Sequence, residues 1–173
     1  MTFMELAKKR YSVRKFKDTP VEQDKIDAML EAARIAPTAK NFQCERIYVI
    51  KSPEVIAKLN ALTRCLYGAP LVFLVAYDTE TQWTTPYPED GDVHSGEVDA
   101  AIVATHMIME AEDLGLGTCY VMWFPVEKTK KALGLPDNEK PVLLIPTGYR
   151  ADDAKPAPLH EKSKALSEFV KEI

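Results

Sequence analysis

The stretch over 96–124, GEVDAAIVATHMIMEAEDLGLGTCYVMWF, constrains the fold more than any other part of the chain. Its first half predicts a helix, because apolar residues occur on almost every side of a 3.6-residue period. Only a thin polar line remains, at Asp99, His106, Glu110 and Asp113. Such a helix must be enclosed, and charges interrupt it too often for a bilayer span, so we expect protein on all sides.

The end of this helix is also predicted by the sequence. Gly115 and Gly117 indicate the stop, because glycine adopts the left-handed cap conformation without strain. Residues 118–124 then alternate like a strand. One chain of 173 residues covers so apolar a helix poorly, so we expect a second copy to pack against it in a symmetric dimer.

Length and charge limit the class of protein. A chain of 173 residues predicts one domain over 1–173. The net charge of -4 argues against general affinity for nucleic acid or an anionic membrane. Residues 1–16 carry charges too evenly for a signal peptide. The chain has an odd number of cysteines, and none of them has the spacing of a metal ligand: they are Cys44, Cys65 and Cys119. This pattern indicates reduced thiols in a cytoplasmic protein.

Start and stop signals predict the other elements. Thr2 and Glu5 have capping-box spacing for a first short helix. Thr19, Pro20 and Glu22 predict the start of a second helix, which ends before Pro37. The remaining expectations are helices over 53–66 and 126–133 and strands over 47–50, 71–77 and 141–149, with 71–77 central in the sheet.

A basic cluster follows the first helix, in the block RYSVRKF. An extended backbone would place Arg10, Ser12 and Arg14 on one side, with Tyr11 between them. Two guanidinium groups flanking a hydroxyl form a plausible phosphate grip, since each donates parallel hydrogen bonds to phosphate oxygens. A solvated basic turn is the alternative interpretation. In the tail, Lys162 and Lys164 would likewise point the same way from an extended segment, or belong to a solvated tail.

Two polar segments are candidates for ligand contact. In the segment over 37–43, Asn41 and Gln43 carry amides that suit the edge of a heteroaromatic ring, although an asparagine there also commonly bonds its own backbone. The segment over 78–95 is long for a plain connection and contains Trp83 and Tyr87. These aromatic side chains suit covering a flat ligand, and a mobile surface loop is the alternative.

Motifs for other chemistries are absent from the sequence. It contains neither GxGxxG nor GxxxxGK[ST], and no nucleophile signature such as GxSxG. His94, His106 and His160 lack the spacing of a zinc site, so we expect no metal. The basic, amide and aromatic residues without a nucleophile indicate a protein whose bound cofactor performs the chemistry, with no catalytic side chain.

Four blocks, in this order along essentially the whole chain, resemble the flavin-dependent nitroreductase family. They are RYSVRKF, APTAKNFQ, DAAIVATHMIMEAEDLGLGTCYV and GYR…KPAPLHEKSKAL. The resemblance implies an α+β fold with an antiparallel-centred sheet flanked by helices. It also implies an intertwined homodimer that binds two FMN molecules at the subunit interface.

The resemblance implies a role for each block. Arg14 would lie near the N1/O2 edge of the flavin, where a cation stabilises the negative charge of the reduced ring. The main chain of Met122 and Trp123 would contact the flavin near N5. The phosphate would be held by Arg10, Ser12, Lys162 and Lys164, within reach of Tyr11. The segment that reaches the flavin, partly from the partner subunit, would comprise Pro37, Thr38, Ala39, Asn41 and Gln43.

The chain also departs from the family pattern. Cys44 stands where proline is usual, and Lys164 stands where arginine is common, so its phosphate contact would be a point charge. The pair Met122-Trp123 replaces a pair that often contains glycine, and the bulk of Trp123 would either narrow the space over the ring or supply a wall of the pocket. Trp83, Tyr87 and Trp123 are the candidates for substrate contact.

The implied function is that of an FMN-dependent oxidoreductase. NAD(P)H would reduce the flavin at N5 in a ping-pong cycle, and a nitroaromatic, a quinone or a similar small molecule would then accept the electrons. Two alternatives stay open. One is another flavin enzyme on the same fold, such as a dehalogenase, a dehydrogenase or a flavin-cleaving enzyme. The other is a flavin-binding module without turnover.

Overall fold

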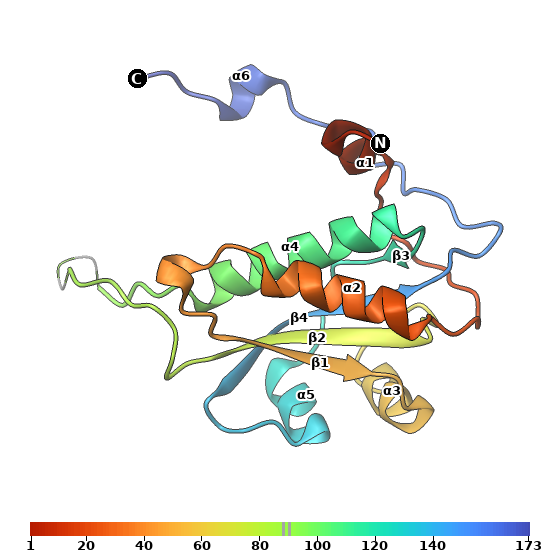
Figure 1. The fold of residues 1–173 in the computed structure, drawn as a ribbon, viewed down its shortest axis with the longest axis horizontal. Coiled ribbons are helices and arrows are strands. Elements are labelled where there is room, and N and C mark those ends of the chain that lie inside the picture. The colour runs from red at the N-terminus through yellow and green to blue at the C-terminus, as the bar shows by residue number, and fades with distance from the viewer. Residues whose placement is uncertain (88, 90) are drawn as a thin grey trace.

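The computed structural model describes residues 1–87, 89 and 91–173, and within them the chain forms an α+β fold (Figure 1). A four-stranded sheet has the order β1-β2-β4-β3, and each neighbouring pair of strands is antiparallel. The strands are β1 (Glu45–Ile50), β2 (Leu71–Asp78), β3 (Gly117–Thr118) and β4 (Glu139–Gly148). The predicted antiparallel-centred sheet is therefore confirmed.

The interior strand β2 divides the core into two parts. All its residues are buried, as its uninterrupted apolar sequence predicted. Leu71, Phe73 and Val75 enter one cluster, while Val72 and Leu74 enter the other, because successive side chains of a strand point to opposite faces. The sheet is thus apolar on both faces, and helices must cover each of them.

Four helices provide that cover. On one face lie α2 (Gln23–Arg34) and α4 (Gly96–Asp113), and on the other lie α3 (Pro53–Asn60) and α5 (Val126–Leu133) (Figure 1). Gly134 closes α5 with a φ of 66°, the left-handed cap that its sequence predicted. The short η1 (Ala39–Asn41) lies between α2 and β1.

The predicted core helix is α4, and it packs against α2 and the sheet. Gly115 follows its C-cap with a φ of +79°, so the predicted stop is confirmed. The helix is enclosed on one side only in the single chain, since Val98 is 61% exposed. Asp99, which the pattern placed on a polar line, is buried, and so is Glu112. One chain thus leaves part of this helix uncovered, and its enclosure by a second copy stays a prediction.

Three predicted boundaries were wrong. The second helix begins at Gln23 with Glu22 as its N-cap, instead of at Pro20 after an N-cap at Thr19. Glu22 is extended, and its carboxylate accepts hydrogen bonds from the Tyr149 hydroxyl at 2.6 and 2.8 Å. The helix expected over 53–66 ends at Asn60. The strand expected over 118–124 shrinks to β3, beyond which one isolated pair joins Val121 to Leu144.

Both ends of the chain project from the body on the same side (Figure 1). The first helix is α1 (Phe3–Lys9), and its predicted capping box forms between Thr2 and Glu5. The tail carries a single turn, α6 (Leu166–Phe169), and every residue over 161–173 is exposed. In the part of the chain that the structure describes, no helix combines the length and apolarity that crossing a membrane requires.

Candidate functional site

The basic cluster is fixed against β3. The Val13 amide donates to the Thr118 carbonyl at 2.8 Å, and Ser12 pairs with Thr118 in a parallel bridge. Val13 is fully buried, whereas Arg14 is exposed. The segment from Arg10 to Arg14 is therefore an ordered, extended edge, which supports the phosphate-grip interpretation over that of a solvated turn.

The two guanidinium groups of this cluster have no carboxylate partner. Among the described residues, neither Arg10 nor Arg14 forms an ion pair, and Arg14 donates only to the Ser12 carbonyl at 3.2 Å. Burial raises the pKa of the Cys119 thiol, and the nearby Arg14, Ser12 and Arg10 side chains oppose that rise. Both guanidinium groups thus act on the Cys119 thiol, and neither is neutralised by a carboxylate of the described chain.

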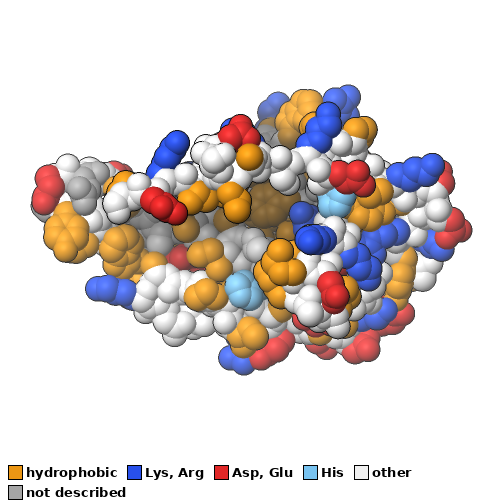
Figure 2. Space-filling model, turned by 90° about the horizontal axis from the view of Figure 1, so that it is seen from above, with side chains coloured by type: hydrophobic (Ala, Val, Ile, Leu, Met, Phe, Trp, Pro, Cys, Tyr) orange, Lys and Arg blue, Asp and Glu red, His pale blue; other side chains and the backbone are white. Residues whose placement is uncertain are grey.

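The cluster belongs to a wider basic surface. Figure 2 views the molecule from above, and in it Lys and Arg side chains gather toward the right-hand end. In Figure 1, α1, β3 and the last turn of α4 lie toward that same end. Tyr11 joins the cluster to the start of the tail: its hydroxyl donates to the Ala154 carbonyl at 3.5 Å, and the Arg150 guanidinium lies 5.3 Å from its ring centroid. Lys162 and Lys164 lie further along the exposed tail, and within the described chain they make no ion pair.

The amide segment over 37–43 has an unusual backbone. Lys40, Asn41 and Gln43 have φ values of 49°, 58° and 50°, in the left-handed region that favours glycine. Two contacts hold this conformation: the Ala39 amide donates to Asp99 Oδ1 at 3.0 Å, and the Gln43 amide donates to the Thr38 hydroxyl at 3.3 Å. Strained backbone that the surroundings maintain is typical of functional sites.

The chain does not bring these two groups together. The amide segment is bonded to Asp99 in the first turn of α4, whereas the basic cluster lies near Glu112 in the last turn, where Lys9 is 3.7 Å from that carboxylate. Asp99 and Glu112 are 13 positions apart, which corresponds to about 20 Å of helix. A ligand that contacts both groups within one chain would have to span the length of α4.

The predicted aromatic residues are divided between two hollows. Trp83 lines a hollow of about 480 Å³ together with Pro37, Thr38, Ala39 and Asp99. Tyr87 is 59% exposed and does not line it. The predicted loop over 78–95 includes positions 88 and 90, which lie outside the described residues.

Trp123 lies at the other hollow, of about 630 Å³, which is lined by residues that follow α3 and residues that follow β3. Its carbonyl accepts from the Thr63 hydroxyl at 2.7 Å, and the Arg64 guanidinium lies 5.1 Å from its ring centroid. Thr63 and Arg64 were not predicted from the sequence, because a lone arginine after a helix carries no motif. Met122 and Trp123 are both well exposed, at 66% and 71%.

The main chain at Met122 and Trp123 offers donors. Within the described residues, neither amide N–H donates to an acceptor of the chain, while the neighbouring Phe124 amide bonds to the Met122 carbonyl at 3.1 Å. Unbonded amides beside a hollow satisfy their hydrogen bonds with water or a ligand. The main-chain contact predicted from the family resemblance therefore has the donors that it needs.

These features define a class of protein. It is an α+β chain with an antiparallel sheet, an unneutralised basic edge and a strained amide segment, and these two groups lie at opposite ends of one core helix. The model of the Nitroreductase family matches residues 7–67 and 61–149. The chain belongs to this family.

Individual relatives agree with the family assignment. A nitroreductase family protein from Clostridium difficile 630 superposes with a TM-score of 0.91 at 38% identity, covering 99% of this chain and 98% of its own. An FMN-dependent nitroreductase from Clostridium difficile R20291 has a TM-score of 0.74 at 25% identity, covering 94% and 98%.

A curated relative from Staphylococcus aureus (strain USA300), named NADPH-dependent oxidoreductase, is 31% identical over 86% of this chain. The chain spans 64% of the length of that relative. The relative thus contains additional sequence, and its activity transfers to this chain only as a proposal.

Proposed function

We propose that the chain is an FMN-dependent oxidoreductase that takes reducing equivalents from NAD(P)H and passes them to a small acceptor such as a nitroaromatic or a quinone. The observation that carries the proposal is the unneutralised pair Arg10 and Arg14 flanking Ser12 on the edge of β3. Family membership and the names of the two relatives, one FMN-dependent and one NADPH-dependent, support it.

The residues present fit FMN by the chemistry of their donors. Guanidinium and hydroxyl groups suit a phosphate, and the unbonded amides of Met122 and Trp123 suit the polar edge of a flavin ring. FMN, when bound, supplies hydride acceptance and electron transfer. Arg10 and Ser12 would hold the phosphate with Lys162 and Lys164, and Arg14 would place positive charge beside the ring.

The remaining residues would shape the space over the ring. Trp123, with Arg64 stacked on it, forms a flat cationic wall at the 630 Å³ hollow. Tyr11 would fix the backbone between the two phosphate ligands through its bond to Ala154. Within one chain Trp83 and Trp123 line different hollows, so an acceptor that lies against Trp123 would meet Trp83 and Tyr87 only from the partner subunit's loop.

We further propose that two copies form an intertwined homodimer. A twofold axis across α4 would place the first turn of one helix beside the last turn of its partner, so that Pro37, Thr38, Ala39, Asn41 and Gln43 of one subunit meet the basic cluster of the other. The surface available for this contact is the shallow hollow of about 390 Å³ lined by Glu97, Val98, Ala101, Ile102 and Thr105.

The first experiment follows flavin binding and reduction. The purified protein should be yellow, and anaerobic NADH or NADPH should bleach it. Arg14→Ala should weaken FMN binding about 10- to 150-fold, since a hydrogen bond to a charged group contributes about 1.5–3 kcal/mol. Lys58→Ala, on the exposed side of α3, is the charge-matched control and should bind as wild type.

Each outcome discriminates between the functions. A colourless protein that ignores added FMN would refute the proposal. Bound flavin that neither nicotinamide reduces would indicate a binding module without turnover. Reduction followed by reactivity with only one class of acceptor would distinguish a nitroreductase from a dehalogenase or another flavin enzyme on this fold.

A second experiment tests whether the site is shared. Arg14→Ala and Asn41→Ala subunits would each form homodimers with two damaged sites, whereas a mixed dimer would contain one intact and one doubly damaged site. Unfolding and refolding the two variants together should therefore recover FMN binding, up to about a quarter of the wild-type sites for random pairing. No recovery would place the whole site within one subunit.

A further inference from the structure

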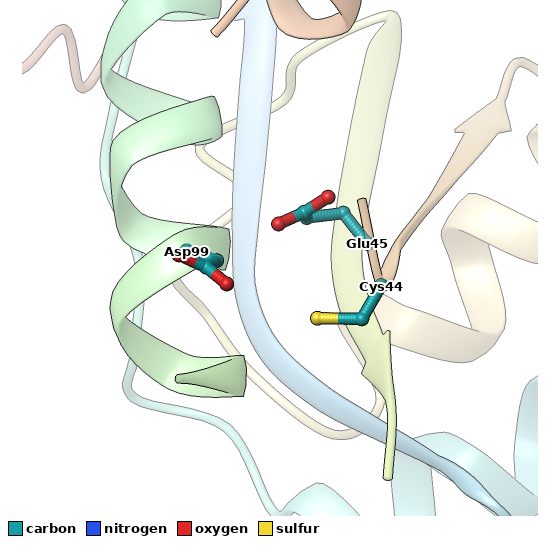
Figure 3. A group of neighbouring side chains, drawn as sticks. All are labelled: Cys44, Glu45 and Asp99. Carbon is teal, nitrogen blue, oxygen red and sulfur yellow. The ribbon is translucent and has the colours of Figure 1, made fainter. Parts of the chain in front are cut away.

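A cluster of three side chains lies directly behind the amide segment over 37–43, and the proposed function assigns it no role. Cys44, Glu45 and Asp99 come from the start of β1 and the first turn of α4, and all three point into the space between them (Figure 3). One ligand atom from each, the Sγ and a carboxylate oxygen of each acid, lies within 4.8 Å of the other two. From the sequence alone, Cys44 was predicted to be a reduced thiol at a position where the family usually has proline.

The cluster has unused bonding capacity. Cys44 is fully buried and Asp99 is 2% exposed. Asp99 Oδ1 accepts from the Ala39 amide, but its Oδ2 and the Oε1 of Glu45 are buried and have no hydrogen-bond partner among the described residues. A buried polar oxygen without a partner costs about 1–3 kcal/mol, so two of them side by side require an explanation.

Among the described residues, Arg46 compensates these groups only in part: its charge opposes the rise in the pKa of Cys44 and of Glu45, but it forms no ion pair with Glu45. The nearest candidate, Arg46, is 2.9 Å from Asp78 and 3.9 Å from Glu139 and is thus engaged elsewhere. Burial raises the pKa of the Glu45 carboxyl, and the Asp99 carboxylate adds to that rise. Two carboxyl groups and a thiol therefore share a dry space that needs either a proton or a bound cation.

We propose that Cys44, Glu45 and Asp99 bind a divalent cation of the zinc class. A thiolate with two carboxylates is a donor set for zinc, and a hard cation such as magnesium would not choose sulfur. Zinc bonds to sulfur at about 2.3 Å and to oxygen at about 2.1 Å, so tetrahedral ligand atoms lie about 3.5 Å apart. Small side-chain rotations would bring the three ligand atoms, which now lie within 4.8 Å of one another, to this shorter spacing. Water would take the fourth position.

The cation can reach the cluster from the surface. Glu45 lines a hollow of about 200 Å³ beside α2, and Asp99 lines the hollow of about 480 Å³ beside Trp83. The cluster therefore adjoins two hollows, one through Glu45 and the other through Asp99. An entry path is one of the conditions for a metal site.

Binding would have a structural consequence. The cation would join β1 to α4 at the residue that already holds the Ala39 amide, and it would close the ends of the strained segment over 39–43. Fixing both ends of a strained segment reduces its unfolding and preserves its left-handed residues. The bound cation would thus stabilise the conformation of the segment over 39–43, whether or not FMN is bound.

The test measures metal binding by the full-length protein with its cofactor content unchanged. After dialysis against a chelator, titration with Zn²⁺ should show about one site per chain by calorimetry, and Zn²⁺ should raise the Tm. Cys44→Ser, Glu45→Gln and Asp99→Asn should each weaken binding at least about 100-fold, the upper end of what loss of an outer-shell partner costs. The asparagine side chain retains an oxygen for the Ala39 amide, so Asp99→Asn should still fold.

A matched control and a spectroscopic signature complete the test. Asp113→Asn removes an exposed carboxylate from the same helix and should bind Zn²⁺ as wild type. Co²⁺ in place of Zn²⁺ should give absorption at longer wavelengths than the flavin bands, and Cys44→Ser should abolish it. Failure of the wild type to bind Zn²⁺ would overturn the proposal. So would a Glu45→Gln variant that binds Zn²⁺ as tightly as the wild type, because the Glu45 carboxylate would then not be a ligand.

Discussion

Gly117 offers the sharpest test of how the basic cluster is positioned. It lies in β3, opposite the segment over 10–14, and a Cβ built at this position would lie 2.7 Å from Val13 Cγ2 and 3.0 Å from Arg150 Cγ. Carbon atoms pack best at about 3.5–4.0 Å, so Gly117→Ala would push the Val13 methyl away by roughly 0.8 Å. Val13 is fully buried, and its own segment would move with it.

The expected cost follows from this geometry. Adding a methyl group to a packed core costs about 1–3 kcal/mol, and Gly117→Ala should destabilise the protein by this amount. Because Val13 lies between Ser12 and Arg14, the displacement also misaligns one proposed phosphate ligand and the proposed cation beside the flavin ring. We expect FMN to bind about tenfold more weakly, which corresponds to about 1.4 kcal/mol.

The assay is chemical unfolding at fixed protein concentration, paired with FMN titration of the apoprotein. Gly115→Ala is the control: its φ of +79° imposes a cost of about 1–2 kcal/mol, but no heavy atom lies within 4 Å of the added Cβ. It should lower stability and leave FMN affinity unchanged.

A second substitution isolates the contact itself. Val13→Ala removes the methyl group that Gly117→Ala meets, so the double variant should be less destabilised than the sum of the single variants by about 1 kcal/mol. Additive effects, or a Gly117→Ala protein with wild-type stability and FMN affinity, would refute the close-packing argument.

Three other predictions concern the core and the titratable groups. Met107→Ala removes a fully buried side chain of α4 and should cost about 2–5 kcal/mol in chemical unfolding. The hydrogen bond from the Tyr149 hydroxyl lowers the pKa of Glu22 from its ordinary 4.5. The stabilisation that this hydrogen bond gives the folded protein is therefore present above pH 4.5 and is lost as the pH falls through the lowered pKa of Glu22. The difference in Tm between wild type and Tyr149→Phe should therefore narrow at acid pH, and a constant difference would contradict the assignment. Cys44, Cys65 and Cys119 are buried and unpaired, so a thiol reagent should label them slowly in the native protein and fully after unfolding.

The elements that the sequence predicted well are those whose signals are local. The buried run of β2, the capping box of α1 and the glycine caps after α4 and α5 each depend on a few neighbouring residues. The start of α2 was wrong because a distant residue decided it: Tyr149 holds Glu22 in an extended conformation that local capping rules do not include.

The same distinction applies to the candidate site. Alternation along the chain predicted that Arg10, Ser12 and Arg14 share an edge, and their position against β3 agrees with that prediction. The burial of Asp99 and Glu112 was not predictable, because both look like ordinary polar positions of a helix. Their partners, the Ala39 amide and the Arg150 guanidinium, lie far away in the sequence. The roles of the site residues toward FMN stay predictions.

Those two carboxylates explain how one helix organises the whole molecule. Asp99 holds the strained amide segment at the first turn of α4, and Glu112 holds Lys9 and Arg150 beside the basic cluster at the last turn. No glycine or proline lies between Gly96 and Gly115, so α4 has no hinge that would bring its ends together. The separation of about 20 Å is therefore rigid within a chain. If both groups contact one flavin, the second contact must come from another copy, and cofactor binding and dimer formation become a single equilibrium.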